Sequence, residues 1–197
     1  MRGKTLARLA VMAVAALALA PVPDAARAAA LGILDEAKIG VLDHDIAIGG
    51  DHKECCVDVN LEALFTSPDF LHVIWSPRPT LGVTVNTRPG RATSYGYFGL
   101  TWEYDFLHSS IIRNDGFFVA LGVGGAVHDM ADNTADTSTS HIKGLGGRIL
   151  FHEEFEGGYR INATYSVSAF LDHISDANLT THNPGLTNLG MRFGYKF

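Results

Sequence analysis

Cysteine is scarce in this sequence, which has only two among 197 residues, Cys55 and Cys56. A disulfide framework needs more cysteines at wider spacing, so the fold cannot depend on one. Neighbouring cysteines form a strained and unusual disulfide at best. We therefore expect a pair of loop thiols without an assigned function. An intermolecular bridge and a metal ligand are the alternatives.

Long apolar runs are also absent from the chain after residue 30. No segment there has 18 consecutive apolar residues. This pattern predicts no transmembrane helix. At the start, Arg2, Lys4 and Arg8 precede an apolar run at 9–20 that is too short to span a membrane, and small residues follow it. The segment 1–28, with cleavage as late as residue 30, is typical of a secretory signal peptide. We expect a single exported domain over residues 29–197.

Basic residues are outnumbered, with 15 Lys and Arg against 21 Asp and Glu and a net charge of −6. The leader carries four bases and one acid, so the net charge becomes −9 after its removal. A chain of this charge is not expected to bind nucleic acid. It is not expected to be attracted to an anionic membrane surface either.

Apolar residues recur at every second position, which is the period of a β-strand. Counting these segments predicts eight strands, at 37–42, 57–65, 80–86, 94–106, 116–127, 143–154, 159–175 and 187–197. The sequence FEGGY at 155–159 is expected to form a tight turn between the sixth and seventh strands. The polar tract at 129–140 is expected to form a long loop.

The face opposite the apolar one mixes glycine and alanine with charged residues, namely Asp58, Glu62, Glu103, Arg148, Arg160, Arg192 and Lys196. Glycine weakens a strand on a soluble surface, but the narrow interior of an eight-stranded barrel needs small residues. The predicted fold is therefore all-β, an eight-stranded antiparallel transmembrane β-barrel of the bacterial outer-membrane type. Its apolar face would meet lipid. A soluble periplasmic lipid-binding barrel is the alternative.

Several polar groups have ordinary structural explanations. His152 is expected to be a hydrogen-bonded interior residue. The sequence HEEFE at 152–156 lacks the zinc-binding pattern HExxH, so it is not expected to be a metal site. It is expected to be a solvated periplasmic strand end. The alternative to an ordinary structural role for His44, Asp51 and His52 is that they bind a cation from a loop.

His173 and Ser175 lie on the apolar, outward side of the seventh strand. A spanning strand uses about 9–11 residues, which places this pair at the depth of the outer-leaflet headgroups and acyl linkages. A serine within reach of a histidine forms a nucleophile and its base.

The segments LGGRILFHEEFEGGYRI and HISDANL…NPGLTNLGMRFGYKF, together with the terminal Phe197, resemble the outer-membrane lipid A 3-O-deacylases, the PagL-like acyloxyacyl hydrolases. The resemblance implies an esterase that removes the 3-O-linked acyl chain from lipid A in the outer leaflet. It also implies that His173 is the general base and Ser175 the nucleophile. We expect no cofactor and no metal, and a homodimer is compatible with these features.

The chain departs from the family at two positions. Asp176 stands where the family usually has an oxyanion-binding Asn, and Thr187 stands where a Glu orients the histidine. The residues that could compensate are Asn178, Asn183 and Asp172. The alternative to an esterase is a catalytically weak or inactive structural or adhesive barrel on the same scaffold.

Overall fold

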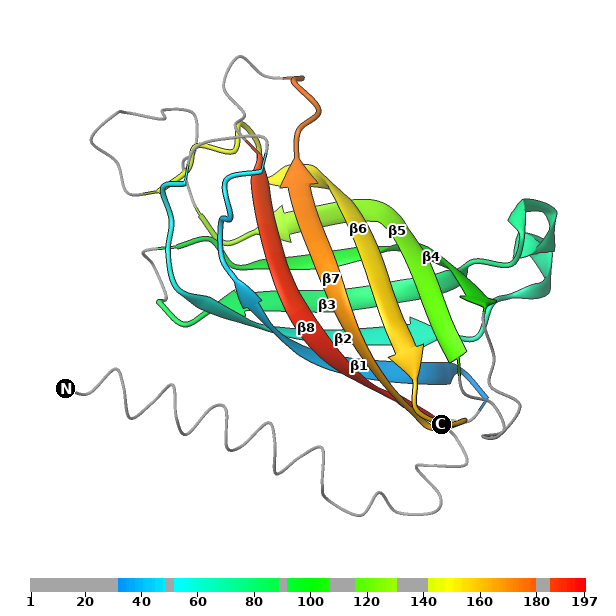
Figure 1. Cartoon of the computed structure of the whole chain (residues 1–197). Helices are drawn as coiled ribbons and strands as arrows, with labels where there is room; N and C mark the ends of the chain where they lie inside the picture. The colour runs from blue at the N-terminus through cyan, green and yellow to red at the C-terminus, as the bar shows by residue number, and fades with distance from the viewer. Residues whose placement is uncertain (1–31, 49–51, 89–91, 107–115, 131–141, 180–184) are drawn as a thin grey trace.

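The computed structural model describes residues 32–48, 52–88, 92–106, 116–130, 142–179 and 185–197. The segment expected to be a signal peptide lies outside these residues. The described chain forms eight strands and one short 3-10 helix (Figure 1), which are β1 Leu34–Asp43, β2 Val57–Phe65, η1 Asp69–Ile74, β3 Arg78–Asn86, β4 Tyr95–Phe106, β5 Gly116–His128, β6 Ile149–Arg160, β7 Tyr165–Ser175 and β8 Leu186–Lys196. No helix in this part of the chain is long and apolar enough to cross a membrane.

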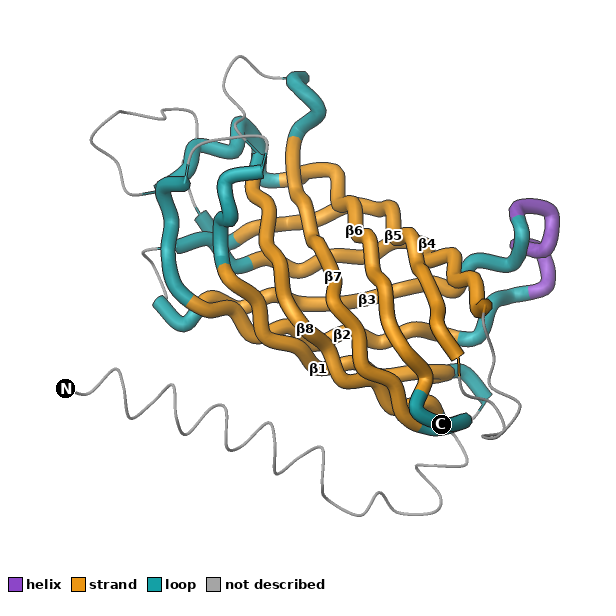
Figure 2. Tube along the Cα trace, viewed as in Figure 1, coloured by secondary structure: helices purple, strands orange, loops and turns teal. Residues whose placement is uncertain are grey.

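The strands pair in sequence order, and β1 pairs antiparallel with β8 to close the barrel (Figure 2). The closing register runs from Glu36 opposite Lys196 to Asp43 opposite Leu189. Closure pairs the backbone of every strand with two neighbours, as a strand surrounded by lipid requires. The predicted fold class is confirmed.

Side chains alternate between a buried lumen face and an exposed outer face. Along β7, Ser166, Ser168 and Asp172 are buried, whereas Tyr165 and Val167 are exposed. The outer face of the other strands is equally apolar, with exposed residues that include Leu61, Leu81, Phe98, Leu121, Phe155, Met191 and Phe193. The apolar flanks therefore face outward, as the alternation predicts for a membrane barrel and not for a soluble one.

The sixth strand lies further along the chain than expected. It runs over Ile149–Arg160, so FEGGY at 155–159 is part of β6, and the connection to β7 is residues 161–164. The prediction of a turn at FEGGY was wrong. His152, Glu154 and Glu156 are buried in the lumen, so HEEFE is not a solvated strand end, although the interior position of His152 is confirmed. Arg148 precedes β6 and is exposed, so it does not belong to the lumen face.

The lumen is filled by aromatic rings and neutralised charges. A Cβ on Gly82 would lie 2.1 Å from the Tyr97 ring, and one on Gly158 would lie 2.5 Å from the Phe118 ring. These glycines therefore make room for the rings, which supports the expected reason for glycine on this face. In the same interior, Arg192 forms a two-pronged ion pair with Glu154 at 2.6 and 2.7 Å.

The connections at one end of the barrel are tied together by buried charges. We call this end, formed by the described residues of the connections 44–56, 87–94, 129–148 and 176–185, the loop end; the opposite end, with residues 34 and 196, is the terminal end. At the loop end, Glu54 accepts hydrogen bonds from the backbone N–H groups of Thr93 (2.6 Å) and Lys143 (2.7 Å). The Lys143 ammonium pairs with Asp45 at 2.5 Å and donates to the Gly185 carbonyl at 3.0 Å. Residues of all four connections are thus held together.

His44 belongs to this buried cluster. Its Nδ1 lies 2.7 Å from Asp58, and its Nε2 lies 2.9 Å from Glu54. Both nitrogens already have carboxylate partners, so His44 is not free to hold a cation, and Asp51 lies outside the described residues. Burial lowers the pKa of His44, but the hydrogen bonds and charges of the two carboxylates outweigh burial and raise the pKa to about 9.

Cys55 and Cys56 are bonded to each other in this connection, and the described chain has no free cysteine. The expectation of two loop thiols was wrong. Cys56 has a φ of 94°, and its carbonyl accepts a hydrogen bond from His44 N–H at 3.1 Å. The bonded pair therefore adjoins the His44 cluster.

The terminal end carries η1 and Trp75, which directly follows it. Phe70 in η1 and Trp75 are exposed, with 73% and 88% of their surface accessible. The Trp102 indole on β4 donates to the Ile74 carbonyl at 2.7 Å and fixes this connection to the barrel. Exposed aromatic residues at the end of a membrane barrel are typical of an interfacial belt.

Replacing Arg192 with methionine should lower the free energy of unfolding by about 3–5 kcal/mol, because it leaves buried carboxylates unpaired. The measurement is urea unfolding in detergent micelles. Lys196→Met is the matched control on the same strand, since Lys196 is partly exposed and lies 3.8 Å from Asp35; it should cost less than about 1 kcal/mol. Equal losses for the two variants would contradict a packed, charge-neutralised lumen.

Raising the pH should weaken the loop end through His44. Its folded pKa lies above the ordinary value of 6.5, so its contribution is complete below pH 6.5 and is lost as pH rises toward about 9. The loss is about 3 kcal/mol. Urea unfolding at pH 6 and pH 9.5 measures it, and His44→Gln should reduce this pH dependence. His72→Gln, which changes an exposed histidine in η1, should leave it unchanged.

Candidate active site

His173 and Ser175 occupy the loop end of β7 and point away from the lumen. Their neighbours Asp172 and Ile174 are buried inside the barrel, whereas His173 and Ser175 are half-buried on the outer face. In the sheet, His173 is paired with Glu153 on β6 and with Thr187 on β8. The two residues named from the sequence therefore share the outer face two positions apart.

Thr187 holds the imidazole of His173. The His173 Nδ1 lies 2.7 Å from the Thr187 hydroxyl, and that hydroxyl donates its hydrogen to the Ile48 carbonyl at 2.9 Å. A hydroxyl has one hydrogen, and a carbonyl can only accept it. Thr187 must therefore accept from His173 Nδ1–H, which leaves Nε2 of the neutral ring unprotonated. This is the nitrogen that can act as a base.

The connection between β1 and β2 fixes Thr187 in turn. The Ile46 N–H donates to the Thr187 carbonyl at 2.9 Å, and Thr187 is buried beneath this segment. The position at which the family places a glutamate thus carries a buried hydroxyl that orients the histidine. It supplies no charge.

Gly185 lies directly against the ring of His173. It has a φ of +63°, and a Cβ there would be 2.7 Å from Cε1 and 3.2 Å from Nε2 of His173. Gly185 directly precedes Leu186, the β8 partner of Ile174. The Cε1–Nε2 edge of the ring therefore lies beside the backbone that leads into β8, and the Lys143 hydrogen bond to the Gly185 carbonyl fixes this backbone.

The other residues expected to support the site are Asp176, Asn178 and Asn183. Asp176 is buried and accepts the Asn178 N–H at 2.8 Å within a turn in which Ala177 and Asn178 have positive φ. A carboxylate that accepts in this way is no substitute for an oxyanion donor. The Asn178 side chain is exposed, and Asn183 lies outside the described residues.

Asp172 does not belong to the site. Its carboxylate lies in the lumen, 3.0 Å from His152 Nε2 and 2.6 Å from the Tyr95 hydroxyl. The expectation that it could compensate for the missing family residues was wrong, because adjacent residues of a strand point to opposite faces.

Glu153 was missed by the sequence analysis. It is exposed on the outer face of β6, directly across from His173. The expected turn at FEGGY would have paired Glu153 with a residue near the terminal end, so no signal connected it with His173. A strand six assigned to Ile149–Arg160 would have revealed the pair.

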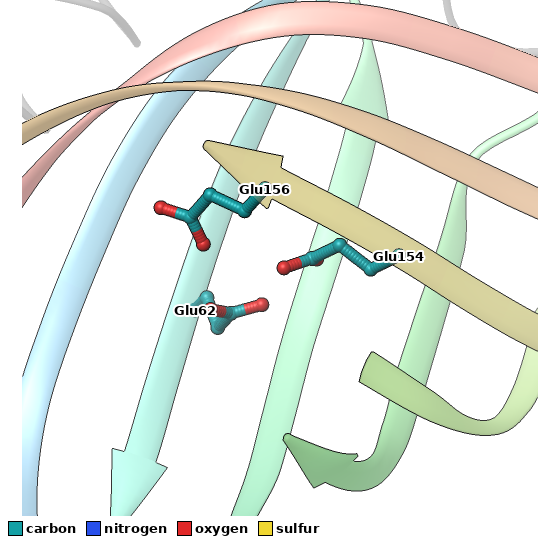
Figure 3. Close-up of side chains that lie close together, drawn as sticks. All are labelled: Glu62, Glu154 and Glu156. Atoms are coloured by element: carbon teal, nitrogen blue, oxygen red, sulfur yellow. The ribbon is translucent and has the colours of Figure 1, made fainter. Parts of the chain in front are cut away.

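One carboxylate cluster could in principle hold a metal ion. Glu62, Glu154 and Glu156 bring oxygen atoms within 4.8 Å of one another inside the lumen (Figure 3), and no other such group occurs among the residues that the structure describes. Arg192 and Lys38 lie among them, with Lys38 2.6 Å from Glu156. Two buried cations therefore already take the place that a metal ion would occupy.

Comparisons with known proteins agree with this architecture. The family model described as lipid A 3-O-deacylase (PagL) matches residues 80–196. No curated protein sequence matches the chain significantly. The crystal structure of the outer membrane enzyme PagL is 14% identical, with a TM-score of 0.57, and the match covers 82% of this chain and 99% of that chain. The crystal structure of Neisserial surface protein A (NspA) is 11% identical, with a TM-score of 0.50, over 84% and 97% of the two chains.

The structural likenesses show the shared barrel fold, and the family match covers more than half of the chain, from β3 to β8. Together they place the protein in the bacterial outer membrane. Barrels of this class have short periplasmic turns and longer external loops, so the loop end faces outward from the cell. By its sequence match and its closed eight-stranded barrel, the chain belongs to the lipid A 3-O-deacylase (PagL) family.

Proposed function

We propose that this protein is an outer-membrane esterase that removes the ester-linked acyl chain from the 3-position of lipid A. Ser175 is the nucleophile and His173 the general base. The observation that carries the proposal is the orientation of the imidazole. Thr187 takes up Nδ1–H, which leaves Nε2 free to act as a base on the outer face that His173 shares with Ser175, two positions along the same strand.

The location of the pair fits a substrate in the outer leaflet. His173 and Ser175 are at the external end of β7, where acyl linkages of a neighbouring glycolipid lie at the same depth. A lipid can therefore present its ester to the wall of the barrel without entering the lumen. The lumen itself is filled by Arg192 and its partners.

The reaction needs one proton acceptor that later returns the proton. The Ser175 Oγ attacks the ester carbonyl carbon while His173 Nε2 takes the hydroxyl proton. The bond to the sugar oxygen then breaks, and the imidazolium gives its proton to that oxygen. A water molecule, deprotonated by the same Nε2, then attacks the acyl-serine. The bond to Ser175 Oγ breaks, the imidazolium returns its proton to that oxygen, and the fatty acid is released.

A non-catalytic barrel on the same scaffold is the second candidate. It is favoured by the neutral Thr187 at the family's glutamate position and by the buried carboxylate of Asp176 near the site. A carboxylate opposes the charge of an oxyanion. The scaffold would then serve a structural or adhesive role.

Expression of the protein in an outer membrane should remove the 3-O-linked acyl chain from lipid A, as measured by mass spectrometry. Ser175→Ala should lower this activity by roughly 1000-fold or more, because the nucleophile is lost. Ser76→Ala is the control, since Ser76 is exposed beyond η1 at the terminal end. An unchanged acyl pattern with abundant folded wild-type protein would favour the non-catalytic barrel.

Thr187→Val should reduce kcat by about 10- to 100-fold, because the imidazole loses the acceptor that sets its tautomer. Thr187→Ser retains the hydroxyl and should stay within a few-fold of wild type. The measurement is single-turnover deacylation of lipid A in mixed micelles. Equal activity of the valine and serine variants would show that the hydroxyl does not orient His173.

A further inference from the structure

Glu153 breaks the pattern of the outer wall. Its neighbours on the same face of β6, Phe151 and Phe155, are exposed apolar residues, with accessible fractions of 47% and 58%. A carboxylate on the lipid face of a barrel has a free-energy cost that grows with depth. Because Glu153 has this cost and does not point into the lumen, we expect it to have a role on the outer face.

Glu153 is not simply part of a solvated rim. The strand β6 runs from the loop end at Ile149 toward the terminal end, so Ile149 and Phe151 both lie nearer the outside of the cell than Glu153. Both are apolar, and Ile149 is 77% exposed. The carboxylate therefore lies below two apolar residues, at the level of His173.

Among the charged groups that the structure describes near His173, Glu153 is the acidic residue that shares the outer face of the barrel with it. The β8 neighbour Thr187 is neutral. Lys143, above Gly185, is paired with Asp45. On the lumen side Asp172 is paired with His152, and Asp176 is buried in the turn after β7.

We propose that Glu153 is a positioning residue that supplies the negative charge needed to stabilise protonated His173 during the reaction. This inference rests on the proposed esterase function. Directly opposite residues of an antiparallel pair have Cβ atoms about 4.5–5.5 Å apart, close enough for a charge to act without a hydrogen bond. An opposite charge at this range favours the protonated imidazole, and a water-poor membrane boundary weakens the interaction less than bulk water does.

Two strands then divide two tasks between them. Thr187 on β8 fixes the ring through Nδ1, and Glu153 on β6 offsets the positive charge that the ring acquires when Nε2 takes the serine proton. A single glutamate at the Thr187 position would perform both tasks. The chain therefore keeps the acid but takes it from the other neighbouring strand.

The first test follows the imidazole of His173 directly, by NMR titration of histidine-labelled protein in detergent micelles, with the signal assigned by His173→Gln. Glu153→Gln should move the titration midpoint of His173 to lower pH. Asp43→Asn is the matched control, because Asp43 is exposed on the outer face at the loop end of β1, two strands from β7. An unchanged midpoint in Glu153→Gln, or an equal change in Asp43→Asn, would overturn the proposal whether or not the protein hydrolyses lipid A.

The second test uses the deacylation assay. Glu153→Gln should lower kcat by about 10-fold, the effect of one charge interaction worth about 1.4 kcal/mol, and should shift the acidic limb of the kcat/KM–pH profile to lower pH. Glu153→Asp should restore part of the rate. A wild-type pH profile in Glu153→Gln, with Ser175→Ala inactive, would refute the role of Glu153 and leave the esterase standing. An inactive wild type would instead refute the esterase.

Discussion

The structure depends on one constraint, which is that an apolar outer wall leaves charged groups only the lumen and the two ends of the barrel. Lys38, Arg192 and their carboxylate partners are all buried inside and paired with one another. The closed β1–β8 pairing satisfies the backbone at the same time. Breaking one buried pair is costly because the remaining charge cannot reach water, so the side chains of the interior are held in place.

The same constraint makes polar residues on the outer face informative. His173, Ser175 and Glu153 lie together on adjacent strands near the loop end, while residues nearer the middle of the outer wall, such as Leu171 and Phe155, are apolar. The loop end supports this group from above, because Ile46, Ile48 and Lys143 bind the start of β8. The buried charges in the loops and the half-buried His173 and Ser175 on the wall are therefore parts of one arrangement.

The sequence was sufficient to predict the fold class and the face on which each strand residue lies, but not the partner across the strand. The face follows from a period of two along each strand, so the outward position of His173 does not depend on where the sixth strand ends. The partner depends on where the turn falls. The two glycines in FEGGY indicated a turn, but one of them, Gly158, in fact makes room for the Phe118 ring in the lumen. The error therefore concealed Glu153 while leaving its face correct. Contacts between distant connections, such as Ile48 with Thr187, have no local signal in the sequence.

Threonine at the family's glutamate position removes an acid from beside His173, but other groups can provide the effects of that acid. A triad acid has two separable effects on its histidine, since it selects the tautomer and it stabilises the imidazolium. The Thr187 hydroxyl can provide the first effect because its own hydrogen is committed to Ile48. The second requires charge but no defined hydrogen-bond geometry, so a carboxylate on the opposite neighbouring strand can provide it. Because a closed barrel gives every strand residue two cross-strand neighbours, an acid lost from one side of His173 can be replaced from the other.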